Sequence, residues 1–379
     1  MKNCRIFYFW SSNKFSLKKP CFRQYAELFF NIRNFTKMNS FFPTVASILS
    51  PIELGKFITE RYHLEEDFAC KLFRTGVNHT YFLSGTTAKY VVRVYCYNWR
   101  TKVEIQEEVK FLDFLKNNNL SISFPLPDKE GNLIQEINAP EGLRYAVLFT
   151  FAEGEKMRFM TNETCHAIGS VMGKIHNITA GKKIARVSYD FDVLLHDAYN
   201  HLNLFFSDEL GEMGYIKQLS AKISKRFAQS NLSENQKGVL HLDIWYDNLS
   251  VNKENEITLF DFDNCGNGLL ILDVGYFCKQ LFFIETDKQE YETKVESFLN
   301  GYRSERSLSE AELKLIPEAG ASVFIFYLGV QAQRFDWSNI FLTENYIKML
   351  GARIKNWIDY YELKELHAAN RKLAPLPND

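Results

Sequence analysis

The stretch from Val239 to Gly266, VLHLDIWYDNLSVNKENEITLFDFDNCG, constrains the fold of this 379-residue chain more than any other part. It carries His241, Asp243 and Asn248 in the order H-x-D-x-x-x-x-N, followed by Asp261 and Asp263 on either side of a phenylalanine. The polar run 252–255 lies between two short apolar segments and has the composition of a turn. We therefore predict a hairpin that brings one amide and three carboxylates close together.

These residue types suit the transfer of a phosphoryl group. Such a transfer needs a group that orients or deprotonates the attacking hydroxyl, and it needs oxygen ligands for Mg²⁺. Asp243 suits the first role, and Asn248 and Asp261 suit the second. The order and spacing match the paired catalytic and metal loops of kinases. The plain alternative is an acidic hairpin without chemistry, but the apolar neighbours Leu242 and Ile244 indicate a packed loop.

The stretch resembles the aminoglycoside phosphotransferase and choline kinase-like family of small-molecule kinases. Members of that family are relatives of protein kinases, and they often have a glycine where this chain has Leu242. The resemblance implies that Asp243 is the catalytic base. It also implies that Asn248 and Asp261 are metal ligands.

Further roles come from the same resemblance. Asp263 stands where protein kinases have a glycine, and because acidic residues are familiar there in small-molecule members, it is included among the metal ligands. His241 is expected to brace the catalytic loop, and Asp273 to tie the following helix to that loop. Cys265, beside the metal loop, is interpreted as a small buried hydrophobic residue.

The bulk composition limits the partners and the compartment. A formal net charge of −1 argues against nucleic acid as a partner. The seven cysteines are an odd number without a C-x-x-C pair, so we expect reduced thiols in a cytoplasmic protein. The chain has no run of 18 apolar residues, so neither a transmembrane helix nor a membrane partner is expected.

Residues 1–37 differ from the rest, because they hold eight Lys or Arg residues against one acidic residue, Glu27. A basic leader of this kind is compatible with a targeting segment or with a nucleic-acid-binding arm. We favour a third interpretation, an extension that is not part of the folded core. Met38 would then be the functional start, because regular patterning begins just after it.

The next hundred residues predict a helix and a set of strands. Ser50, Pro51 and Glu53 form a helix start with a capping box. Strand-like runs follow at 70–74, 81–84, 89–97 and 144–151. The turn at 75–80 holds Gly76 and Asn78, which the family resemblance places over the phosphates of ATP.

Arg93 is a single charge in the apolar run Tyr90–Val94, so it requires a partner or an exposed position. In the family, a basic residue here contacts the ATP phosphates and pairs with a glutamate of the next helix. We predict Glu108 as that partner, with Glu107 as the alternative. A surface arginine whose charged end reaches solvent is the plain interpretation.

The second half of the chain is mostly helical in pattern. Phe149 and Phe151 fall in the segment 149–154 that the resemblance assigns to the interlobe linker, whose backbone binds adenine. Helices are expected from Thr161, twice within 190–229, and from about 285 to 366. His176 in the first of these is interpreted as a structural histidine.

Together these observations predict an α+β, protein-kinase-like bilobal fold. The predicted parts are an extension (1–37), a nucleotide-binding small lobe with an antiparallel sheet (38–148), a linker (149–154) and a larger, mainly helical catalytic lobe (155–379). The predicted function is ATP- and Mg²⁺-dependent phosphoryl transfer to a hydroxyl of an amino alcohol, a sugar or an aminoglycoside. Two alternatives stay open: a Ser/Thr protein kinase of the same family, and an inactive nucleotide-binding module.

Overall fold

A computed structural model describes residues 42–64, 68–334 and 342–373, with side chains up to residue 365. Contacts between residues divide the chain into two units, Met1–Thr44 and Val45–Asp379. All the elements below belong to the second unit, and the extension predicted over residues 1–37 lies outside the described residues. No described helix is both long enough and apolar enough to cross a membrane.

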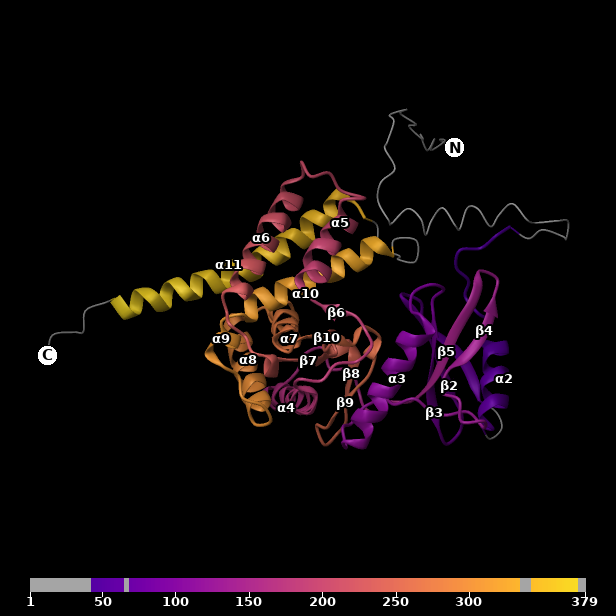
Figure 1. Cartoon of the computed structure of the whole chain (residues 1–379). Coiled ribbons are helices and arrows are strands. Elements are labelled where there is room, and N and C mark those ends of the chain that lie inside the picture. Colours follow the sequence, from indigo (N-terminus) through magenta and orange to yellow (C-terminus); the bar gives the residue numbers. More distant parts are fainter. Residues whose placement is uncertain (1–41, 65–67, 335–341, 374–379) are drawn as a thin grey trace, which may run out of the picture. The chain divides into compact units, whose positions relative to one another are not determined.

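A five-stranded antiparallel sheet in the order β1-β2-β3-β5-β4 forms the first part of this unit (Figure 1). Its strands are β1 (Ala69–Arg74), β2 (Asn78–Ser84), β3 (Lys89–Tyr95), β4 (Gln135–Ala139) and β5 (Gly142–Thr150). The strands expected from the sequence are all present. Because β2 begins at Asn78, the turn predicted over 75–80 is shorter than expected.

Strand alternation turns the two faces of the sheet toward different helices, α2 (Pro51–Tyr62) and α3 (Lys102–Asn117). The face that carries Val92 and Ala146 packs in one buried cluster with residues of α2. The opposite face, which carries Val147 and Phe149, packs with residues of α3. Arg93 follows Val92 in β3, so its side chain lies on the α3 face.

The helices α2 and α4 (Asn162–Thr179) begin with N-terminal caps, although one predicted capping box is not complete. Ser50 accepts a hydrogen bond from the Glu53 amide at 3.4 Å, as expected. The capping box predicted there is incomplete, because the Glu53 carboxylate pairs with Lys56. Thr161 caps α4, in agreement with the change to a helical period at this residue.

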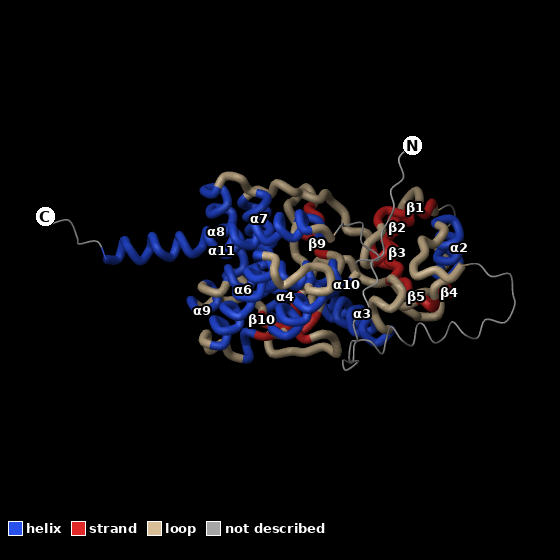
Figure 2. The backbone as a smooth tube through the Cα atoms, turned by 90° about the horizontal axis from the view of Figure 1, so that it is seen from above, coloured by secondary structure: helices blue, strands red, loops and turns tan. Residues whose placement is uncertain are grey.

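The remaining part is mainly helical, and Figure 2 shows it beside the strands β1–β5. Its helices are α4, a π-helical segment (Asp192–Asp197) that runs into α5 (Ala198–Leu202), α6 (Gly211–Ala228), α7 (Ile271–Ile284), α8 (Lys288–Arg303), α9 (Glu310–Leu313), α10 (Ile316–Gln333) and α11 (Glu344–Leu373). Its short strands are β6 (Ser188–Tyr189), β7 (Lys237–Leu240), β8 (Leu249–Val251), β9 (Ile257–Leu259) and β10 (Gly266–Leu269). The π-helical start was not predicted from the sequence.

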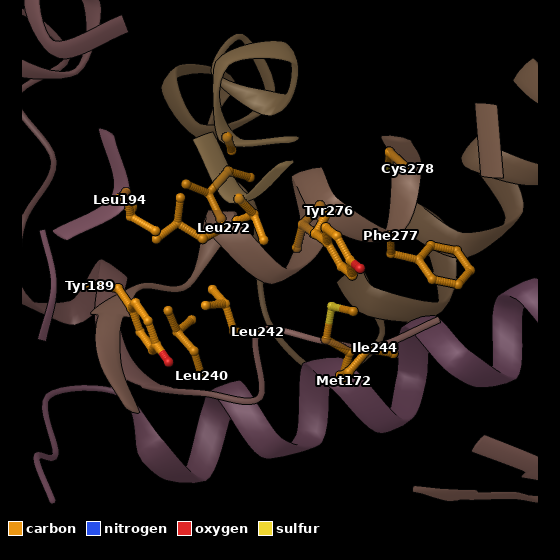
Figure 3. Packing of buried hydrophobic residues seen from close by; sticks show 14 of the residues in the cluster. Met172, Tyr189, Leu194, Leu240, Leu242, Ile244, Leu272, Tyr276, Phe277 and Cys278 are labelled. Carbon is orange, nitrogen blue, oxygen red and sulfur yellow. The ribbon is translucent and has the colours of Figure 1, made fainter. Parts of the chain in front are cut away.

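The largest buried cluster runs through this helical part and fixes the segment that follows β7. Leu242 and Ile244 of that segment lie between α4 and α7, near Met172 and Tyr276 (Figure 3). Leu242 and Ile244 are almost completely buried. The apolar residues around Asp243 therefore anchor the loop in the core, as the sequence indicated.

Candidate active site

The predicted hairpin is present. Strand β8 pairs antiparallel with β9, and Leu249 stands opposite Leu259. Asn248 directly precedes β8, and the Phe260 amide after β9 donates a hydrogen bond to the Asn248 carbonyl at 3.1 Å. The hairpin therefore holds the loop that carries Asn248 beside the loop that carries Asp261.

Hydrogen bonds to both carboxylate oxygens fix the side chain of Asp243. Tyr276 of α7 donates its hydroxyl to Asp243 Oδ1 at 3.0 Å, and Asn248 Nδ2 donates to Oδ2 at 2.7 Å. Burial raises the pKa of Asp243 to about 8, and the nearby charge of Asp261 raises this pKa as well. The hydrogen bonds from Tyr276 and Asn248 act in the opposite direction because they stabilise the ionised form.

His241 and Asp273 hold the catalytic loop from two sides. The His241 Nδ1 atom accepts a hydrogen bond from the Asp243 amide, so its Nε2–H donates to the Phe260 carbonyl at 3.1 Å. Burial lowers the pKa of His241, which favours this neutral form. Asp273 accepts hydrogen bonds from the amides of His241 and Leu242, at 3.0 and 2.7 Å. These contacts are the ones expected of a loop brace and of a tie to α7.

Leu242 has a left-handed backbone, with φ +66°. Its Cβ makes this conformation costly, which gives a physical reason for a glycine at the same place in relatives. Two features offset the cost of this backbone conformation. The Leu242 side chain is completely buried, and the Leu242 amide donates a hydrogen bond to Asp273. Asp261 also has a φ of +66°, a conformation that aspartate tolerates better.

The predicted ion pair between Arg93 and Glu108 is present and buried. The Arg93 Nη1 atom lies 2.6 Å from Glu108 Oε1, and its Nη2 atom lies 3.0 Å from Asp261 Oδ1. Arg93 therefore connects α3 to the loop that follows β9. The alternative partner, Glu107, forms an ion pair with Lys110 at 2.7 Å.

Asp263 does not have the contacts of a metal ligand, which corrects the sequence-based prediction. Its carboxylate accepts hydrogen bonds from Trp99 Nε1 at 2.6 Å and from Arg100 Nε at 3.2 Å. Its side chain is only 5% exposed. Burial by itself would raise the pKa of Asp263, but the charges of Arg100, Arg93 and Arg186 hold this pKa at about 2. Asp263 is thus a buried anion that joins the segment after β3 to the metal loop.

A pocket lies between the sheet and the β8–β9 hairpin. Its walls include the predicted residues Arg93, Phe149, Phe151, Asn248 and Asp261. Phe82, Val91, Leu112 and Phe262 add apolar surface. The pocket thus has an apolar part beside the linker and a charged part beside the two loops.

The other residues predicted to contact ATP lie elsewhere. Glu108 is completely buried behind Arg93. Gly76 and Asn78 are not among the residues that line the pocket. A Cβ at Gly76 would meet only the Asn78 carbonyl, at 3.9 Å, so the structure does not require a glycine there. Asn78 Oδ1 is buried without a hydrogen-bond partner among the described residues.

Sequence reasoning missed an ion cluster at this pocket. Asp247 pairs with Arg74 of β1 at 2.8 Å and with Lys156 after the linker at 2.7 Å. All three residues line the pocket. The partners are far apart in sequence, so no spacing could reveal them. Asp247 directly precedes the predicted metal ligand Asn248, and this was the only available signal.

The arrangement fits a magnesium site shared with phosphate oxygens. Because Asn248 donates its Nδ2 to Asp243, its Oδ1 is the atom that can bind a cation. Asp261 supplies carboxylate oxygens in the same pocket. The described residues contain no cluster of three or more His, Cys, Asp or Glu side chains suited to a metal. Two protein ligands suit Mg²⁺, which commonly keeps water and substrate phosphates in its coordination sphere.

A family model described as the phosphotransferase enzyme family matches residues 70–308. This chain belongs to that family. A homoserine kinase from Agrobacterium fabrum is 29% identical over 292 residues, which cover 75% of this chain and 85% of that protein. The protein is therefore a phosphotransferase enzyme of a small-molecule kinase family.

Solved structures show the same fold. The amicoumacin kinase hAmiN, in complex with AMP-PNP, Ca²⁺ and Ami, has a TM-score of 0.68 at 19% identity, with 82% of this chain and 94% of that chain covered. A microcompartment-associated aminopropanol kinase has a TM-score of 0.67 at 19% identity, with 81% of this chain and 95% of that chain covered. The predicted protein-kinase-like fold is confirmed.

Proposed function

We propose that this enzyme transfers the γ-phosphoryl group of ATP, in the presence of Mg²⁺, to a hydroxyl group of a small molecule. The observation that carries this proposal is the convergence of Asp243, Asn248 and Asp261 beside a pocket that also holds Arg93. Among an amino alcohol, a sugar and an aminoglycoside, an amino alcohol has the most support. The homoserine and aminopropanol kinases are named for acceptors that carry both an amino and a hydroxyl group.

Asp243 is the group that orients and deprotonates the acceptor hydroxyl. Tyr276 and Asn248 fix one hydrogen bond on each of its carboxylate oxygens, so the remaining lone pairs keep a defined direction. A proton acceptor held in this way contributes typically 10²–10⁴-fold to a reaction rate.

Asn248 and Asp261 hold the metal ion, and Arg93 contacts the phosphates. Bound Mg²⁺ supplies charge neutralisation at the phosphate oxygens. The Arg93 guanidinium is fixed by Glu108 on one side and by Asp261 on the other, so the cation is already oriented before a ligand enters. The apolar walls at Val91, Phe149 and Phe151 suit the base of the nucleotide. The backbone of 149–154 is proposed to bind its polar edge.

Two other functions are less well supported. A protein kinase needs a platform for its substrate, whereas only the short strand β10 lies between Asp263 and the start of α7 at Ile271. A module that binds nucleotide without turnover has no need for Asp243, which is nevertheless held by two donors.

The proposal is tested by measuring ADP release with MgATP and a panel of hydroxyl compounds that includes amino alcohols, sugars, aminoglycosides and a generic protein substrate. We expect acceptor-dependent ADP release with a small molecule, and loss of this activity when EDTA removes the metal. Acceptor-dependent release with the protein substrate alone would favour the protein kinase. Tight ATP binding without any acceptor-dependent release would contradict the proposed function.

A further inference from the structure

Lys279 is a buried basic residue on the side of α7 that carries Tyr276. The Lys279 residue is only 3% exposed. Its Nζ atom lies 3.4 Å from the ring centroid of Phe324 in α10 and 5.3 Å from that of Phe283. Among the described residues, no carboxylate forms an ion pair with it, and its polar contact is Gln280 Oε1 at 3.5 Å. A charge buried in this way is costly unless an anion accompanies it.

A second basic side chain lies near the same aromatic ring, that of Phe283. Arg353 of α11 is exposed, and its guanidinium carbon is 5.8 Å from the ring centroid of Phe283. Burial lowers the pKa of Lys279, and the positive charge of Arg353 lowers it further. No described carboxylate forms an ion pair with Arg353 either. Among the described residues, this corner between α7, α10 and α11 therefore holds two basic side chains that form no ion pair with a carboxylate.

Hydrogen bonds connect this corner to the proposed catalytic base. Gln280 Nε2 donates to the Tyr276 hydroxyl at 2.6 Å, and that hydroxyl donates to Asp243 Oδ1 at 3.0 Å. The charge of Asp243 is close enough to raise the pKa of Lys279. The proposed catalytic base and Lys279 therefore both lie beside the part of α7 that runs from Tyr276 to Gln280.

We propose that Lys279 and Arg353 bind a carboxylate of the acceptor, so that the amino alcohol favoured above is one that also carries a carboxylate, a hydroxy amino acid. This inference rests on the proposed phosphotransfer and specifies the acceptor of the same site. A carboxylate suits the planar fork of an arginine, and it would supply an ion-pair partner that neither basic side chain has among the described residues. The aromatic faces around Lys279 already hold that amine, so they do not form a site for an ammonium group.

Three acceptors that carry their amine or carboxylate on the third carbon from the hydroxyl oxygen test the inference. Homoserine carries an amine and a carboxylate, 4-hydroxybutyrate carries only the carboxylate, and 3-aminopropan-1-ol carries only the amine. The measurement is kcat/KM for each acceptor at saturating MgATP. We expect kcat/KM for each of the two acceptors with a carboxylate to exceed that for 3-aminopropan-1-ol by about 30-fold or more. A difference of this size is the effect of a hydrogen bond to a charged group.

Substitutions at Lys279 and Arg353 test whether these residues cause the preference for acceptors with a carboxylate. Lys279→Met keeps the apolar stem and should lower kcat/KM for the two carboxylates while leaving that for 3-aminopropan-1-ol within about threefold. Arg353→Gln, at an exposed position, should reduce the same preference without affecting folding. Lys288→Met is the matched control, because Lys288 also lies over an aromatic ring, at 3.6 Å, but donates to the backbone carbonyls of Phe282 and Glu285.

Equal use of the three acceptors by the wild type would overturn the inference, and so would an unchanged preference in both Lys279→Met and Arg353→Gln. If only acceptors without a carboxylate are phosphorylated, the carboxylate site is wrong while the phosphotransferase proposal stands. If no hydroxyl compound is phosphorylated, both proposals fall.

Discussion

Glu108 is the carboxylate that Arg93 and Arg186 share in a buried cluster. Replacing Glu108 should therefore lower the free energy of unfolding more than replacing Arg93 does. The Glu108 carboxylate lies 2.6 Å from Arg93 Nη1 and 3.5 Å from Arg186 Nη1, and it accepts a hydrogen bond from the Tyr95 hydroxyl at 3.0 Å. Glu108→Gln keeps the shape of the side chain but leaves two buried guanidinium groups without their common charge. Arg93→Met removes one cation, while Glu108 keeps Arg186 and Tyr95.

The loss of one partner of a buried ion pair costs about 3–5 kcal/mol when an uncompensated charge is left behind. We expect a cost of this size for Glu108→Gln. For Arg93→Met we expect a smaller cost of about 1–2 kcal/mol, because Glu108 keeps Arg186 and Tyr95, and the half-exposed Asp261 can be solvated by water. Urea unfolding of each variant at pH 7 measures the free energy of unfolding. Glu107→Gln breaks a pair whose Lys110 side chain is exposed, while the glutamine amide oxygen can still accept the hydrogen bond from the Ala185 amide; this matched control should cost less than about 1 kcal/mol.

The same variants separate folding from nucleotide binding. Arg93→Met should weaken MgATP binding in a calorimetric titration while most of the protein stays folded, and Arg93→Lys should restore part of the affinity. The reasoning would be refuted if Arg93→Met cost as much stability as Glu108→Gln, because Arg186 and Tyr95 would then contribute nothing to Glu108. Unchanged MgATP affinity in Arg93→Met would assign the phosphate contact to another residue.

Asp261→Asn should abolish both Mg²⁺-enhanced ATP binding and turnover. Asp243→Asn should leave MgATP affinity near the wild-type value and reduce kcat by about 100-fold or more. Equal loss of MgATP affinity in both variants would contradict these roles. Gly154→Ala should cost at least about 2 kcal/mol in urea unfolding, because a Cβ there would lie 2.4 Å from a backbone carbonyl of β8 at a φ of +110°. Gly181→Ala, with a φ of +72° but open space around it, should cost only about 1 kcal/mol, and equal costs would refute the steric explanation. Burial and then Arg144 lower the pKa of His79 from 6.5 to about 4, so below pH 6.5 the unfolded chain binds a proton that the folded chain does not. Stability should therefore fall by up to about 3 kcal/mol as the pH drops from 6.5 to 4, and His79→Gln should flatten this part of the curve of unfolding free energy against pH.

Local patterns, together with the family resemblance that they carry, predicted the fold and the hairpin at the centre of the site. The hairpin could be predicted because its turn, its two strands and its polar loops are adjacent in the sequence. The pairing of Arg93 with Glu108 could also be predicted, because a charge inside an apolar strand requires a partner and the next helix supplies one. The spacing of Asp243, Asn248 and Asp261 and the family resemblance predicted a shared site, and the roles assigned to these residues stay a prediction.

The tertiary structure decided the features that depend on which segments meet. Asp263 looked like a metal ligand in the sequence, but Trp99 and Arg100 reach it from a distant segment and hold it as a buried anion. The left-handed backbone of Leu242 is maintained by Asp273, which lies 31 residues later in the first turn of α7. Nothing in the local sequence distinguishes Lys279 from other helix residues. Its burial depends on residues of another helix, such as Phe324 of α10. In each case the decisive energy comes from desolvation and from a partner distant in sequence. Neither leaves a local pattern, because both exist only once the chain has folded.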